Sequence, residues 1–282
     1  MKIGLVLEGG ASRTVYTCGV LDCLLDNEIY IDYVLGVSAG IAYGVSYSSR
    51  QKGRNYSIFE KFVPDPRYMG IKHLLSKKKS YYNFDFIFDE MPAKYLPFDW
   101  EGYKKYGETS YAVITNINTG LPEYYRVSPD DKRWLLLRAS SSLPLLFPPV
   151  IINGKEYLDG GITDSIPFEQ ALKDGCDKVI VVLTRERGYV KKKESAASIM
   201  KIFYRKYPNL IKAIENRHVM YNNQLERLSE LEKEGKALVI APKSTHGISR
   251  TESDSKILLP YFKEGYDDTY TIINSIRDFI NK

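Results

Sequence analysis

The sequence is short of cysteine, histidine and long apolar runs, and each shortage excludes a class of protein. Its three cysteines are an odd number for a disulfide framework and lack the spacing of a zinc site. The longest run without a charged residue, 33–49, is short for a membrane span and is interrupted by Gly and Ser. At the N-terminus, Glu8 ends the apolar stretch too early for a secretory signal. We therefore expect a cytoplasmic protein whose contact with a membrane, if any, is peripheral.

The charged residues are nearly balanced. The chain has 40 Lys and Arg against 35 Asp and Glu, a net charge of +5, which is too even to predict nucleic-acid binding. No dinucleotide or zinc motif is present, so we expect neither a cofactor nor a metal. With 44% hydrophobic residues, the 282-residue chain can form one large core, and we expect a single domain over 1–282. The sequence makes no prediction of oligomeric state.

The N-terminal third predicts two strand–loop–helix units. Residues 3–7 are apolar and end at Gly9-Gly10, and residues 15–25 have helical spacing of apolar side chains. Residues 33–35 start a second unit that turns at Gly36. Two such units close together favour an α/β fold with a mainly parallel sheet.

The rest of the chain continues this alternation with two departures. Residues 67–100 contain a lysine run at 77–79, many aromatics and two prolines, and we interpret them as an insertion or cap. Residues 185–235 form a basic helical region. The other predicted elements are strands at 110–116 and 124–127, a helix at 130–140, a hairpin at 150–157 turning at Asn153-Gly154, a helix from Pro167 to Gly175, strands at 178–183 and 237–240, and a closing helix at 261–280.

Within the basic region, residues 199–214 combine apolar side chains with Lys and Arg. An amphipathic helix of this composition can lie on an anionic lipid surface. A surface helix that packs its apolar side on the core is the commoner alternative.

Gly36-Val37-Ser38-Ala39-Gly40 fits the nucleophile-elbow pattern. In this pattern a strained turn between a strand and a helix raises a serine hydroxyl above the sheet. The pentapeptide alone is a weak signal, but a predicted strand precedes it and a helix can follow it, which is the required context. The alternative is a glycine-rich turn with a solvated serine.

Residues 8–13, Glu-Gly-Gly-Ala-Ser-Arg, follow the first strand and open the first helix. Several backbone N–H groups can therefore point at one anion, as the oxyanion of a tetrahedral intermediate requires. The alternative is a loop that binds the phosphate of a nucleotide. Neither the dinucleotide pattern nor the P-loop pattern fits these residues.

A general base is needed beside a nucleophilic serine, and the chain has only three histidines. His246, in a loop after the last predicted strand, is the one plausible member of a histidine triad. The other candidate is Asp159, which is followed by Gly160-Gly161, so that another group can approach it closely. Asp-Gly is also common in ordinary turns, which is the alternative interpretation of these residues. To act as a base, Asp159 has to lie near Ser38 and be partly desolvated, because a solvated carboxylate with a pKa of about 4 is a poor base.

The order of these three motifs, a glycine loop with Arg13, then G-x-S-x-G, then Asp-Gly-Gly, resembles the patatin-like phospholipase family, notably its bacterial members. Residues 7–22 and 139–161 are also similar to that family. The resemblance implies a three-layer α/β/α sandwich, here with a helical and basic cap region, and release of acyl chains from phospholipids, lysolipids or simpler esters. It also implies a Ser38–Asp159 dyad and an oxyanion hole of the Gly9, Gly10 and Ala11 amides. Arg13, Gly36, Gly40, Gly160 and Gly161 take supporting places in these motifs.

Two positions depart from the family pattern. Ala11 stands where members usually have a third glycine, and Thr14 where they have a glycine after the arginine. An alanine still donates its N–H, so the hole can form provided that its φ is negative. These departures favour a lipid-binding or regulatory protein with little turnover as the alternative to a phospholipase A, lysophospholipase or esterase. An acyltransferase is a further alternative, because the same residues would serve it.

Overall fold

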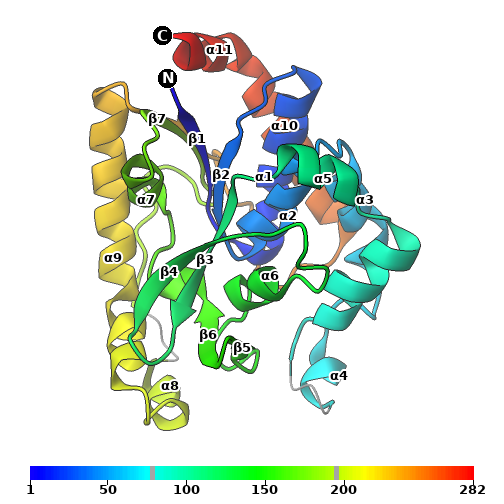
Figure 1. Cartoon of the computed structure of the whole chain (residues 1–282), viewed down its shortest axis with the longest axis vertical. Coiled ribbons are helices and arrows are strands. Elements are labelled where there is room, and N and C mark those ends of the chain that lie inside the picture. Colours follow the sequence, from blue (N-terminus) through cyan, green and yellow to red (C-terminus); the bar gives the residue numbers. More distant parts are fainter. Residues whose placement is uncertain (77–79, 194–196) are drawn as a thin grey trace.

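The computed structural model describes residues 1–76, 80–193 and 197–282, and the described part contains one sheet with helices on both faces (Figure 1). The strand order is β5-β6-β3-β2-β1-β7-β8, with β4 paired to β3. Strands β3, β2, β1, β7 and β8 are parallel neighbours, whereas β4 and β6 run antiparallel to β3, and β5 runs antiparallel to β6. The strand bounds are β1 Ile3–Leu7, β2 Tyr33–Val37, β3 Ser110–Asn116, β4 Leu121–Arg126, β5 Val150–Ile152, β6 Lys155–Asp159, β7 Lys178–Val182 and β8 Ala237–Ile240.

The side chains of β1 alternate between two apolar cores, as the pleat of a strand dictates. Leu5 and Leu7 pack in a core with α1, α2 and α10, whereas Val6 packs with α7 and α9 on the opposite face. The predicted three-layer α/β/α arrangement is therefore confirmed. The helices of the two outer layers are α1 Val15–Asp26, α2 Ala39–Ser48, α10 Ser255–Thr271 and α11 Ile273–Asn281 on the first face, and α7 Phe168–Lys173 and α9 Pro208–Lys233 on the second.

Three predicted helices have different bounds in the structure. The helix predicted over 130–140 is α6, Leu135–Ser140, because Trp134 has a left-handed φ of 54° and interrupts the turn before it. The closing helix begins earlier, where Asp254 accepts a hydrogen bond from the N–H of Lys256, and it breaks between α10 and α11. The amphipathic segment is likewise split, because α8 (Ala197–Phe203) ends before Pro208 starts α9. By contrast, the 150–157 hairpin is confirmed, with positive φ at Asn153 and Gly154 in its turn.

Residues 67–100 lie beside α6 and contain α4 (Ile71–Leu74) and the π-helical segment η3 (Phe86–Tyr95). Buried Arg138 of α6 holds this segment through ion pairs to Asp85 (3.0 Å) and Asp89 (2.7 Å). The lysine run at 77–79 lies outside the described residues. The function of 67–100 as a cap stays a prediction. The remaining short helices are η1 Ala11–Thr14, α3 Arg54–Ser57, η2 Ile58–Phe62, α5 Trp100–Tyr106 and η4 Gly160–Ile162.

Candidate functional site

The register of the sheet brings Ser38 and Asp159 together. Strand β2 ends at Val37, which is paired with Val113 of β3, and β6 ends at Asp159, which is paired with the next β3 residue, Ile114. Ser38 and Asp159 are therefore neighbours at one edge of β3, although 121 positions separate them in the sequence, and both line one polar pocket. Strand β1 ends beside β2, since Leu7 is paired with Gly36, so the loop from Glu8 onward reaches the same place.

Ser38 has the strained backbone of a nucleophile elbow. Its φ of 53° and ψ of −129° lie outside the conformations that most side chains adopt, and α2 begins at the next residue. The flanking glycines are required by close packing: a Cβ on Gly36 would lie 2.8 Å from the Ile41 nitrogen, and one on Gly40 would lie 2.6 Å from the Leu7 carbonyl oxygen. The strained turn between a strand and a helix that the elbow pattern predicts is therefore present.

The carboxylate of Asp159 is buried, and only one of its two oxygens accepts a hydrogen bond. Its Oδ1 accepts a hydrogen bond of 2.8 Å from the Gly161 N–H, whereas Oδ2 has no hydrogen-bond partner in the described part of the chain. Burial raises the pKa of Asp159, and the Ser38 hydroxyl is the foremost of the groups that lower it, followed by Arg217. Ser38 and Asp159 thus line the same pocket, and no hydrogen bond joins their side chains.

The loop after β1 presents unused donors to the same pocket. Among the described residues, the N–H groups of Gly9, Gly10 and Ala11 donate to no protein acceptor, and all three residues line the pocket. Ala11 has a φ of 51°, so the condition of a negative φ is not met: this alanine adopts the left-handed conformation that glycine adopts freely. In this conformation Ala11 still lines the pocket with its N–H unbonded, so the stated condition was too strict. Thr14, with a φ of −64°, occupies a conformation open to any residue and needs no glycine.

The supporting residues lie where the motifs place them. Gly160 approaches Val113 so closely that a Cβ would be 2.2 Å from its carbonyl oxygen. Gly161 accepts a 2.6 Å hydrogen bond from the Arg217 Nε through its carbonyl oxygen. Arg13 is buried and lines the polar pocket.

No histidine lines the pockets that contain Ser38, although all three histidines are among the described residues. His246 instead bonds Glu264 at 2.8 Å, with more than half of its side chain exposed. The carboxylate beside Ser38 is that of Asp159, so the geometry favours the dyad over the histidine triad.

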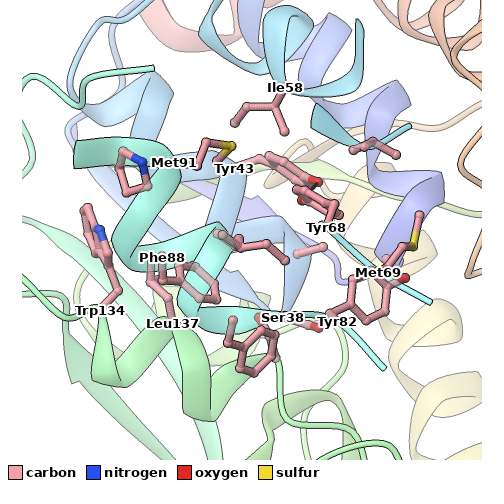
Figure 2. A pocket seen from close by; sticks show the side chains of 18 of the residues that line it. Ser38, Tyr43, Ile58, Tyr68, Met69, Tyr82, Phe88, Met91, Trp134 and Leu137 are labelled. Atoms are coloured by element: carbon pink, nitrogen blue, oxygen red, sulfur yellow. Dashed lines mark hydrogen bonds between the residues drawn. The ribbon is translucent and has the colours of Figure 1, made fainter. Parts of the chain in front are cut away.

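Ser38 also opens on a second, apolar pocket (Figure 2). Figure 2 shows Ser38 at one end of this pocket, with aromatic and aliphatic side chains around the remainder. Ala11, Ser38 and Leu143 line both pockets and form their junction. The labelled lining residues are Tyr43, Ile58, Tyr68, Met69, Tyr82, Phe88, Met91, Trp134 and Leu137.

Sequence reasoning missed four cationic residues of the polar pocket and one polar contact to Ser38. The cationic residues are Arg185, Lys191, Arg217 and Arg250. The polar contact is Ser140, whose Oγ accepts a 2.8 Å hydrogen bond from the Ser38 N–H. No local motif marks any of them, because they come from distant segments; the basic composition of 185–235 is the only signal for three of the cations.

Comparisons with known proteins agree with these features. A family model described as patatin-like phospholipase matches residues 5–172, and a domain of unknown function, DUF6363, matches residues 207–281. The chain is 28% identical over 195 residues to the uncharacterized protein YjjU of Escherichia coli, covering 65% of this chain and 52% of YjjU. It is 27% identical over 191 residues to the lysophospholipase NTE1 of Saccharomyces cerevisiae, covering 64% of this chain and 10% of NTE1.

The chain therefore spans about half the length of YjjU and about a tenth of NTE1. Among solved structures, VipD from Legionella pneumophila is similar with a TM-score of 0.47 and 15% identity, over 97% of this chain and 67% of VipD. Within the described residues, no helix combines the length and apolarity needed to cross a membrane. Because the match over 5–172 covers more than half of the chain, this protein belongs to the patatin-like phospholipase family.

Proposed function

We propose that this protein is a serine-dependent lipid acyl hydrolase. The observation that carries the proposal is the position of Ser38: a strained elbow holds it beside a buried, half-satisfied carboxylate and at the end of an apolar pocket. The relatives named lysophospholipases support a lipid ester as substrate. The alternatives, a binding protein with little turnover or an acyltransferase, use the same residues.

The proposed reaction has two steps. Asp159 accepts the proton of the Ser38 hydroxyl while the oxygen attacks the ester carbonyl, and the amides of Gly9, Gly10 and Ala11 bind the oxyanion. Collapse of the tetrahedral intermediate expels the alcohol, which receives the proton from Asp159. Water then attacks the acyl-enzyme by the same route and releases the fatty acid. The burial that raises the pKa of Asp159 makes it a stronger base than a solvated carboxylate.

The apolar pocket is the proposed site of the acyl chain. Its walls are almost entirely aromatic and aliphatic side chains, many of them from residues 67–100 (Figure 2). Burying an acyl chain there contributes about 0.8 kcal/mol for each methylene. This proposed role also gives the predicted cap a function, since its side chains cover the acyl chain.

A fluorophosphonate probe and a fatty-acid release assay test the proposal together. The wild-type protein should be labelled at Ser38 and release fatty acid from a lysophospholipid, and Ser38→Ala should abolish both. Labelling of the wild type without fatty-acid release, even with alcohols as acceptors, would favour a binding protein. Ester products formed in competition with water would identify an acyltransferase.

We also propose peripheral contact of a cytoplasmic protein with anionic membranes. The three cysteines are free and buried, as suits a reducing compartment. Helix α8 packs Met200 against the core but exposes Ile202 by 73% and Phe203 by 71%. It lies at the end of the molecule opposite both termini, where α4 also lies with Ile71 exposed by 70% (Figure 1).

Vesicle sedimentation tests this contact. Ile202→Asp, and separately Arg205→Glu with Lys206→Glu, should each lower binding to anionic vesicles several-fold, because they remove apolar insertion and electrostatic attraction, respectively. Ile257→Asp, at a half-exposed isoleucine of α10, is the matched control for the first change. Unchanged binding by both variants would exclude α8 and the turn after it as the docking surface.

A further inference from the structure

Among the described residues, five cationic side chains and two carboxylates line the polar pocket beside Ser38. The cations are Arg13, Arg185, Lys191, Arg217 and Arg250, and the carboxylates are Glu8 and Asp159. The hydrolysis proposed above uses Asp159 and backbone amides, and so accounts for none of the five positive charges. Such an excess of one sign in a recess concentrates anions.

Both oxygens of the Glu8 carboxylate are already engaged by other groups. Oε2 accepts a 2.6 Å hydrogen bond from the Thr184 N–H, and Oε1 accepts a 2.8 Å bond from the Tyr221 hydroxyl. Glu8 therefore stabilises the framework of the pocket through these two hydrogen bonds.

Arg13 is the most buried of the five cations. Its side chain is only 6% exposed, and its Nε has no hydrogen-bond partner in the described part of the chain. Burial, followed by repulsion from Arg185 and Arg250, lowers the pKa of Arg13 to about 10. A buried guanidinium that lies near two others and has an Nε without a partner is unfavourable unless an anion occupies the space between them.

The framework orders three of the other cations. Lys191 lies 4.6 Å from the ring of Tyr221, and its backbone N–H and C=O both bond the Asn222 side chain on α9. Arg185 lies 4.5 Å from the ring of Tyr189.

Arg250 is fixed through its backbone, since its carbonyl oxygen accepts hydrogen bonds from the Ser12 hydroxyl (3.0 Å) and the Tyr82 hydroxyl (2.7 Å). These contacts tie segments far apart in the sequence to the loop after β1. The pocket is thus preorganised, which lowers the entropy lost on binding.

The two pockets meet at the nucleophile, and this junction defines the shape of a ligand. With an acyl chain in the apolar pocket and its ester carbonyl at Ser38, the alcohol part extends into the cationic pocket. We propose that the cationic pocket binds the phosphate of an anionic headgroup, so that the preferred substrate is a lysophospholipid with a net negative headgroup. This inference rests on the proposed acyl hydrolase function and names its substrate class.

A zwitterionic choline headgroup fits the cationic pocket less well. A quaternary ammonium is recognised by aromatic faces and carboxylates. Here Lys191 already lies over the ring of Tyr221, and hydrogen bonds engage both Glu8 oxygens. A trimethylammonium group would therefore face cations, whereas a phosphate accepts charge-assisted hydrogen bonds from the guanidinium groups.

The test compares three substrates with one acyl chain: 1-acylglycerol 3-phosphate, 1-acylglycerophosphocholine and monoacylglycerol. We expect the wild type to hydrolyse the phosphate ester with a kcat/KM at least tenfold above the other two. Arg185→Gln with Lys191→Gln should lower this preference at least tenfold, because charge-assisted hydrogen bonds are lost. Lys212→Gln, at an exposed lysine of α9 that does not line the pocket, should preserve it.

Binding of glycerol 3-phosphate to the wild type, measured by calorimetry, separates failure of this inference from failure of the proposed function. Equal hydrolysis of all three substrates, or a preference that survives in a folded double variant, overturns the anionic subsite while the hydrolase stands. If no substrate is cleaved, the hydrolase fails. The cationic pocket then stands only if glycerol 3-phosphate binds and the double variant loses binding. Inorganic phosphate bound as tightly, without preference among lipids, would instead indicate a site for the free ion and overturn the proposal.

Discussion

The two pockets that meet at Ser38 come from different parts of the chain. The described residues that line the apolar pocket all lie between 11 and 147, inside the segment that matches the patatin-like family. In the cationic pocket, four of the five cations lie after residue 184, beyond that segment, and Arg217 and Arg250 lie in the region that matches a domain of unknown function. The proposed reacting centre and acyl site therefore belong to the family segment, whereas most of the charge around the proposed site of the leaving group comes from the C-terminal region.

The largest expected effect comes from Asp159→Asn, which removes the proposed base at the polar side of the junction. We expect kcat/KM to fall at least about a thousandfold, as for loss of other catalytic carboxylates that assist serine. The free energy of unfolding at pH 7 should rise. Because burial raises the pKa of Asp159, the carboxyl stabilises the folded state below its unfolded pKa of about 4, and this contribution is lost as the pH rises through the folded pKa. Asparagine cannot ionise, so it avoids that loss.

Asp164→Asn is the matched control for this variant. Asp164 is also buried, and burial raises its pKa, but it bonds Tyr124 and Gln224 and does not line the cationic pocket. Its activity should stay within a few-fold of the wild type. Equal losses in the two variants would show that Asp159 acts through folding and not through proton transfer.

The apolar side of the junction is tested by Ile87→Trp, since Ile87 lines that pocket from η3. The larger ring should displace the end of a long acyl chain. Loss of about two buried methylenes lowers kcat/KM roughly tenfold, with short-chain esters little affected. Ile151→Trp, at an exposed isoleucine of β5, is the control. A uniform loss for all chain lengths would contradict the assignment of the pocket to the acyl chain.

The smallest effect is expected from Ala11→Gly, at a residue that both pockets share. Ala11 has a φ of 51°, and glycine adopts this conformation without the strain of a Cβ. We expect a gain of about 0.5–1 kcal/mol, or a rise in Tm of about 2–4 °C, with activity preserved. A fall in Tm would show that the alanine side chain stabilises the loop more than its conformation costs.

Local patterns predicted most of the sheet and the reacting centre. The Gly36-to-Gly40 elbow, the glycine loop and the Asn153-Gly154 hairpin each have backbone requirements that short stretches of sequence express. The proximity of Asp159 to Ser38 was predicted only from the resemblance to the patatin-like family. No local pattern expresses it, because it depends on the pairing of β2 and β6 with adjacent residues of β3.

Two kinds of feature were not predicted from the sequence. The break between α10 and α11 and the late start of α6 at Trp134 are set by single residues whose φ and ψ have no sequence signature. The cationic pocket gathers Arg13 from η1, and Arg185 and Arg250 from loops, and these segments meet only in the folded protein. Composition marked part of this region as basic but could not place its charges beside Ser38.

The pH dependence of fluorophosphonate labelling tests the Ser38–Asp159 dyad most directly. The account predicts that the rate of labelling rises with pH through one ionisation whose pKa lies above the usual value of about 4 for aspartate, because burial raises the pKa of Asp159. It also predicts that Asp159→Asn removes this ionisation together with nearly all of the labelling, while Asp164→Asn keeps both. A labelling rate whose pH profile is the same in Asp159→Asn as in the wild type would contradict the dyad.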